Sequence, residues 1–260
     1  MRSPVALPPA AQDILNSLEL ARDSALDAGH SAASRLSGLP RDASAGQRER
    51  LSAERDRHAE RHRVLAQIVS RINQFRTELA AGVVLEPAPA VEIKLKSGET
   101  PSDAVERLRG EISAIRQQLQ ATRSAPLPLA DQKQLIAQSV LERAQSGRPR
   151  VVVADDAARI AFRENIPVTS LLCWLMPDVM TAALSAELIE RAGAMPADER
   201  TRKVAELEAL LLAAERSEAA LIERARETGI EVLPRVDMDV RAFLGVNVAT
   251  ANHVAVERVA

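Results

Sequence analysis

Apolar residues recur at helical spacing along the stretch VERLRGEISAIRQQLQAT. They are separated by three, four, three and four residues, which is the heptad spacing of a helix that presents one apolar seam to a neighbour. Thr100 and Pro101 predict the start of this helix, which we expect to run to about Arg123. Its seam comprises Val105, Leu108, Ile112, Ile115 and Leu119.

A longer helix is predicted between Gln47 and Ala81, where the chain contains neither proline nor glycine. Ser44 has capping-box spacing to Gln47, and Gly82 follows the last helical residue. Such a helix spans roughly 50 Å at about 1.5 Å per residue, so another long helix is needed to cover its apolar side. Its seam comprises Leu65, Val69, Ile72 and Leu79.

Three further segments complete the first half of the chain. Pro8 and Pro9 open a helix that Gly29 can close, and the following HSAASRLSGLPRDASAG is typical of a loop. Between the two seam helices, VVL and the alternating VEIKLK are strand candidates. We expect a short β-ribbon at about residues 83–96, packed on the helices or joined to a neighbour's strand, because a two-stranded ribbon alone is marginal.

In the second half the apolar residues are clustered rather than striped, which indicates elements buried on more than one side. The segment NIPVTSLLCWLMPDVMTAALS has the length of a helix-turn-helix. It carries mostly apolar residues where a DNA-recognition helix would carry Arg, Asn or Gln, so we expect it to be part of the core. The expected elements are a helix at about 129–145, a strand at 151–153, a helix capped by Asp155 or Asp156, helices after Pro167 and Pro177, a long helix at about 197–228, a turn of helix at DVRAFL, and short strands at IEVL and HVAVERV.

These elements predict a mainly α fold with two regions. Residues 1–125 are expected to form an elongated region of long, coiled-coil-like helices, and residues 126–260 a compact α-rich region with a few short β-strands. Pairing of the seams within the chain is the default, because adjacent helices joined by compact connectors commonly fold back as antiparallel hairpins. Pairing between molecules is the alternative. Because elongated helices with continuous seams generally need a partner, we expect a homo-oligomer.

Composition narrows the classes of partner. The chain is 46% hydrophobic but 2% aromatic, so it lacks the stacking residues of single-strand nucleic-acid binders and of many ligand pockets. A net charge of −2 provides no field that favours a polyanion. The single cysteine fits a reducing compartment, and the longest apolar runs are too short to cross a bilayer. We expect a cytoplasmic protein without a membrane partner.

The candidate catalytic and metal-binding residues have structural explanations. Glu54, His58 and His62 are spaced to share one side of a helix as metal ligands, but both histidines lie on the seam, where they are expected to set its register. Cys173 is flanked by apolar residues and is expected to be a buried small hydrophobe. Paired acids at 155–156 and at 237 and 239 fit helix caps and turns.

Motifs of common enzyme classes are absent from the sequence. It contains no phosphate-binding glycine loop, dinucleotide fingerprint, nucleophile elbow or H-E-x-x-H. We therefore expect no catalytic, cofactor-binding or metal site, and the hypothesis is a non-enzymatic structural or assembly protein that acts through its helical seams on a protein partner or on itself.

Nucleic-acid binding is the alternative, through the arginine-rich helix at residues 48–63. The run QRERLSAERDRHAERHR contains six arginines that could contact phosphates. Four acidic residues are interleaved with them, which favours an ion-paired face with little net field.

Residues 206–246, ELEALLLAAERSEAALIERARETGIEVLPRVDMDVRAFLGV, resemble in pattern uncharacterised helical proteins encoded in prophage-like regions of GC-rich bacteria. The pattern is a charged helix, a glycine stop, a short strand, Arg and Asp around a turn, and a final LGV. The resemblance implies a phage-associated structural component, which would then be virion-associated, and it carries no catalytic residues over.

Overall fold

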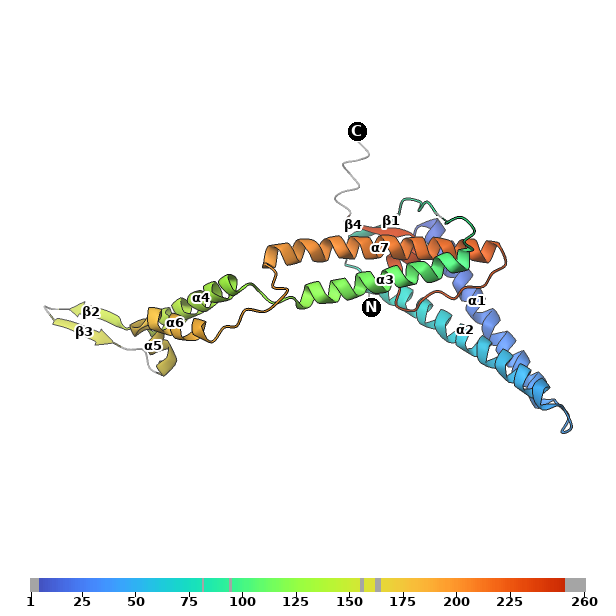
Figure 1. Cartoon of the computed structure of the whole chain (residues 1–260), viewed down its shortest axis with the longest axis horizontal. Coiled ribbons are helices and arrows are strands. Elements are labelled where there is room, and N and C mark those ends of the chain that lie inside the picture. The colour runs from blue at the N-terminus through green and yellow to red at the C-terminus, as the bar shows by residue number, and fades with distance from the viewer. Residues whose placement is uncertain (1–4, 81, 94, 155–156, 162–164, 251–260) are drawn as a thin grey trace, which may run out of the picture. The chain divides into compact units, whose positions relative to one another are not determined.

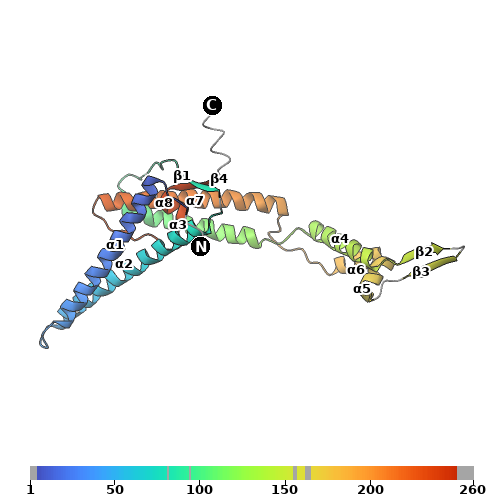
Figure 2. The same ribbon diagram turned by 180° about the vertical axis from the view of Figure 1, so that it is seen from behind.

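The structure, a computed structural model, confirms a mainly α protein. It is 69% helical and describes residues 5–80, 82–93, 95–154, 157–161 and 165–250. Within these residues there are eight helices and four short strands, labelled in Figures 1 and 2. The chain divides into two compact units: unit 1 is Met1–Arg116 with Glu208–Ala260, and unit 2 is Gln117–Leu207.

Unit 1 begins with a helical hairpin of α1 (Pro9–Ser37) and α2 (Ala45–Glu78), which lie side by side in both views (Figures 1 and 2). The predicted cap of α2 is confirmed, since the Ser44 side chain accepts a hydrogen bond from the Gln47 N–H at 3.2 Å. By contrast, α1 continues through Gly29, where its end was expected. A Cβ added at Gly29 would lie 3.6 Å from the Cβ of His58, so close packing on α2 stabilises the helix past this glycine.

A two-stranded antiparallel sheet joins distant parts of unit 1. Strand β1 (Val83–Pro87) pairs with β4 (Val246–Thr250). The predicted ribbon at 83–96, in which VVL would pair with VEIKLK, is therefore wrong. The described residues that follow β1, up to 100, form no strand. Prolines 87 and 89 lack the N–H needed to continue a ladder into that segment. IEVL is not a strand either, and HVAVERV lies outside the described residues.

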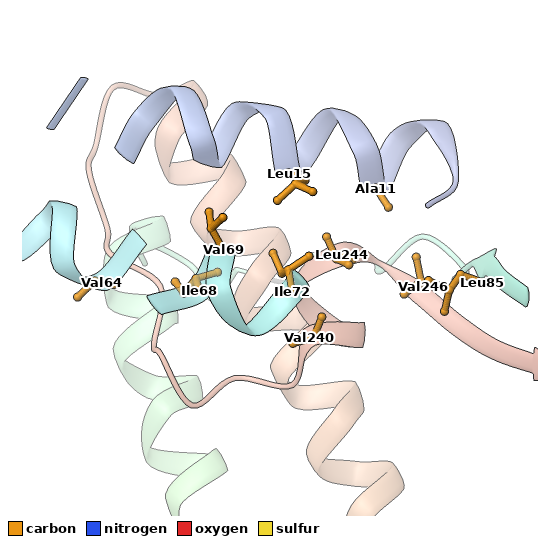
Figure 3. Close-up of a cluster of buried hydrophobic side chains, with 10 residues drawn as sticks. All are labelled: Ala11, Leu15, Val64, Ile68, Val69, Ile72, Leu85, Val240, Leu244 and Val246. Atoms are coloured by element: carbon orange, nitrogen blue, oxygen red, sulfur yellow. The ribbon is translucent and has the colours of Figure 1, made fainter. Parts of the chain in front are cut away.

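The main hydrophobic cluster lies where the hairpin meets this sheet and α8 (Val240–Leu244) (Figure 3). In the close-up, Leu15 projects from α1 toward Ile72 of α2 and Leu244 of α8. The predicted helical turn at DVRAFL is thus confirmed as α8. The buried members of the cluster are Ala11, Leu15, Val64, Ile68, Val69, Ile72, Leu85, Val240, Leu244 and Val246.

A second cluster lies between α3 (Pro101–Ser124) and α7 (Ala197–Glu227), and both helices occupy the predicted ranges. The start of α3 is fixed by a reciprocal cap in which Thr100 and Asp103 each accept a hydrogen bond from the other's backbone N–H at 3.2 Å. The buried residues of this cluster are Ala104, Val105, Leu108 and Leu221.

Unit 2 contains the C-terminal end of α3, the N-terminal end of α7, three whole helices and a β-hairpin. Helices α5 (Val168–Leu175) and α6 (Pro177–Ala186) pack on α4 (Leu129–Gly147). Strand β2 (Arg150–Ala154), predicted from its valines, pairs with β3 (Ala157–Ala161). A helix was expected in place of β3, but AARIA fits either period, and pairing with β2 selects the strand.

The division into units differs from the expected boundary at residue 125. The C-terminal part of the chain returns to unit 1 because α7 packs on α3 and β4 pairs with β1. Only the central segment forms a unit of its own.

The close contact between α4 and α5 predicts how a methyl group added at Gly147 changes the stability of unit 2. A Cβ added at Gly147 would lie 2.1 Å from the Ser170 carbonyl oxygen, whereas one added at Gly110 in α3 would meet no atom within 4 Å. We expect Gly147→Ala to destabilise unit 2 by roughly 1–3 kcal/mol through overpacking, and Gly110→Ala to stabilise its helix by about 0.5–1 kcal/mol. Urea unfolding followed by circular dichroism measures both, and equal effects of the two substitutions would contradict the close approach of α4 and α5.

Candidate interaction surfaces

The α2 seam is covered by the chain itself. Leu65, Val69 and Ile72 are buried, and Val69 and Ile72 belong to the cluster with α1 and α8, against which Leu79 also packs. Val69 and Ile72 are therefore covered by elements of the same chain.

The α3 seam is largely covered as well. Val105 and Leu108 pack with Leu221 of α7, and Ile112 and Leu119 are buried. Ile115 is half-buried. For the seam residues that the two clusters contain, the pairing is therefore within the chain.

Beside this seam lie two buried carboxylates that the sequence analysis did not single out, Glu215 and Glu218 on α7, with exposed fractions of 2% and 0%. Arg109 of α3 donates to Glu218 at 2.9 Å, and Arg116 of α3 donates to Glu215 at 2.8 Å. Arg235, in the loop after α7, donates to Glu218 at 2.8 Å and to Glu215 at 3.3 Å. We call these five residues the arginine–glutamate network.

Backbone and side-chain groups of the loop complete the network. The Asp239 N–H donates to Glu215 at 2.9 Å, and Arg109 donates to the Leu233 carbonyl at 2.6 Å. Asp237 pairs with both Arg116 and Arg235. Arg71 of α2 donates to the carbonyls of Val236 and Met238, so α2 holds the same loop.

Two groups of this loop have shifted pKa values. Burial opposes the charge of Arg235, but hydrogen bonds to Glu218 and Glu215 outweigh it, so the pKa of Arg235 is raised. Burial likewise opposes ionisation of Asp239, but hydrogen bonds from Arg241 outweigh it and the pKa of Asp239 is lowered. Its carboxylate caps α8 by accepting from the Arg241 N–H at 2.8 Å, the capping role predicted for this acid.

The arginine-rich helix has much of its charge engaged within the chain. Arg55 pairs with Asp56, Arg63 with Glu60, and Arg61 with Glu231 in the loop after α7. Arg48 donates to the carbonyls of Pro40 and Arg41. These contacts fit the interleaved face that the sequence predicts, and phosphate binding by this helix stays a prediction.

Glu54, His58 and Cys173, which were considered as metal ligands or as a nucleophile, contact a neighbouring helix or are buried. Glu54 accepts from Arg35 of α1 at 2.9 Å, and His58 lies against Gly29 of α1. Among the described residues no group of three potential metal ligands converges. Cys173 is buried, as expected, while Asp155 and Asp156 lie outside the described residues.

Unit 2 exposes large apolar side chains where a core was expected. Of its described side chains, the large apolar ones that are exposed are Leu135, Leu141, Ile160, Val168, Leu175, Met176, Val179, Leu184 and Ile189. The buried apolar ones are Leu119, Val140, Cys173 and Leu207. Clustered apolar residues indicated burial, but among the described side chains of unit 2 more of the large apolar ones are exposed than buried.

No single helix among the described residues has the length and apolarity of a membrane span; α5 and α6 meet these criteria only as a pair, and the pair is bent by 107°. Comparison with protein-family models, curated proteins and solved structures finds no match to the chain.

The network predicts unequal effects for two glutamates of the same helix. Glu218→Ala removes a fully buried carboxylate to which Arg109 and Arg235 both donate, and breaking such a buried pair costs roughly 3–5 kcal/mol. Glu223→Ala removes only a surface pair with Arg226, worth about 0–1 kcal/mol. The difference in stability between the two variants is measured from their urea unfolding midpoints, provided that the free energy of unfolding falls with urea at the same slope in both. Similar midpoints for the two variants would show that the network contributes no more than surface pairs do.

Proposed function

We propose that the protein is a non-enzymatic assembly component whose copies associate through the exposed apolar surface of unit 2. The proposal rests on the number of apolar side chains that unit 2 leaves exposed. Among its described residues, nine large apolar side chains are exposed and four apolar ones are buried. Six of the nine lie within residues 168–190, on α5, α6 and the segments beside them, and contiguous exposed apolar patches generally mark interaction sites. Unit 1, by contrast, contains both hydrophobic clusters and covers most of its seams.

A second copy of the chain fits the charge on this surface. Residues 168–190 carry Asp178, Glu187 and Glu190 and no lysine or arginine. The β-hairpin of the same unit and its approach carry exposed arginines at 148, 150 and 159. Two copies can therefore offer each other both an acidic and a basic rim, as a two-fold interface requires.

Both copies contribute apolar side chains to such a contact. Each copy exposes six large apolar side chains within residues 168–190, and full burial of one Val, Leu, Ile or Met side chain contributes roughly 1.5–3 kcal/mol. Association costs about 4–15 kcal/mol in lost freedom, so burial of only part of these side chains is enough to hold two copies together.

In this proposal the seam residues pack within the chain, and the contact between copies lies on unit 2 rather than on the seams. The role in a phage particle that the 206–246 pattern implies would be one use of such an assembly component, and it stays a prediction.

Charges placed on the surface of unit 2 should separate the copies. Val179 and Ile189 are 61% and 77% exposed, so Val179→Asp with Ile189→Asp should leave the fold intact and lower the mass measured by multi-angle light scattering to that of a monomer. Leu20→Asp in α1, at a position 72% exposed but in unit 1, is the matched control and should keep the wild-type mass.

Two results would contradict the proposal. One is a wild-type protein that is monomeric at all concentrations up to those used for scattering. The other is binding to lipid vesicles that the double variant abolishes while the mass in solution is unchanged, which would assign the surface to a membrane.

A further inference from the structure

A cavity of about 710 Å³ lies within unit 1. Residues of α1, α2, α7 and α8 line it, and loop residues 88–91 and 229–234 complete its wall. This volume falls in the range of small-molecule sites, roughly 300–1,000 Å³. An organic ligand of moderate size therefore fits by volume.

The cavity adjoins both hydrophobic clusters of unit 1. Ile14 and Leu18 of α1 and Phe243 of α8 pack against the first cluster. Ile222 of α7 and Val232 of the loop that follows pack against the second. All five residues line the cavity and are only half-buried, so both clusters leave apolar surface uncovered there. An apolar ligand would cover this surface on both sides and join the two clusters.

Short side chains account for the open volume. Helices α1 and α7 line the cavity with Ala21, Ala219 and Ala220, and α8 lines it with Ala242. Because protein interiors are close-packed, larger side chains at these positions would fill the space. Water in a hollow with an apolar wall finds few hydrogen-bond partners, so an apolar group that displaces this water gains affinity.

The charged residues of the wall balance one another. Three arginines and three acids line the cavity, namely Asp13, Arg61, Arg216, Glu223, Arg226 and Glu231. Arg61 pairs with Glu231 at 2.6 Å, and Arg226 pairs with Glu223 at 2.7 Å. The wall therefore has no surplus of either sign, and an ionic group that enters it would lose hydration without gaining a net opposite charge.

We propose that this cavity binds an uncharged, mainly hydrocarbon ligand, which completes the core between the two clusters. A neutral amphiphile is preferred over its anionic or cationic analogue, because the wall is apolar and its charges balance. The site lies wholly within unit 1, so it does not depend on the association proposed for unit 2.

Three probes of equal chain length test this preference on the wild-type protein. Isothermal titration calorimetry below the critical micelle concentrations, at neutral pH, should show saturable binding of decanol at a single site. Decanoate and decyltrimethylammonium have the same hydrocarbon body with a charge of either sign. Each should bind about tenfold more weakly or worse, because its charged group loses hydration in the cavity.

Variants then locate the site. Ala220→Trp on α7 and Ala21→Trp on α1 each place an indole ring in the cavity and should weaken decanol binding by about tenfold or more. Ala213→Trp is the matched control and should keep the wild-type affinity, because Ala213 is exposed on α7 outside the cavity. Val179→Asp with Ile189→Asp, which places charges on unit 2, should keep it as well.

Decanoate or decyltrimethylammonium that binds as tightly as decanol would overturn the preference for a neutral ligand. Decanol binding that survives both cavity variants, or that the unit 2 variant abolishes, would overturn the location. The absence of saturable decanol binding to the wild-type protein would overturn the proposal as a whole. Because the probe comparison needs no variant, it decides the ligand class even if a tryptophan variant fails to fold.

Discussion

The packing of unit 1 depends on two carboxylates that have no access to water. Glu215 and Glu218 are tolerated inside the protein only because guanidinium groups from α3 and from the loop after α7 reach them. The loop is thereby held against α3 and α7, and Arg71 holds it against α2. This loop leads directly into α8 and β4, which contribute to the first hydrophobic cluster. The two hydrophobic clusters share no residue, and the arginine–glutamate network links them within one unit.

The sequence predicts what local chemistry decides. Caps such as those at Ser44 and Thr100 set the helix starts, and the helical spacing of both seams corresponds to buried faces. It does not predict what depends on distant partners. β1 takes its partner from the far end of the chain, and glutamates and arginines on amphipathic helices are by default solvated. One signal for the network was present, because Glu218 lies in the apolar stripe of α7 between Ala214 and Leu221.

The seams and the surface of unit 2 show why an apolar pattern alone does not identify an interface. A regular stripe requires a neighbour, and in unit 1 the chain provides that neighbour. A dense apolar cluster also requires one, and α5 and α6 leave theirs exposed after packing on α4. The pattern specifies how much surface must be covered, and the fold specifies whether the same molecule covers it. The candidate surface of this protein thus lies in the segment where the sequence predicted a core.

Hydrogen–deuterium exchange measured over a range of protein concentrations distinguishes association of copies through unit 2 from association through the seams. Backbone amides within residues 168–190 should become more protected as concentration rises, because association covers them, whereas amides of α2 around Leu65–Ile72 and of α3 around Val105–Ile112 should exchange at the same slow rate throughout. Protection that rises with concentration in α2 or α3, and not in α5 and α6, would show that the seams are the contact between molecules and would contradict the account.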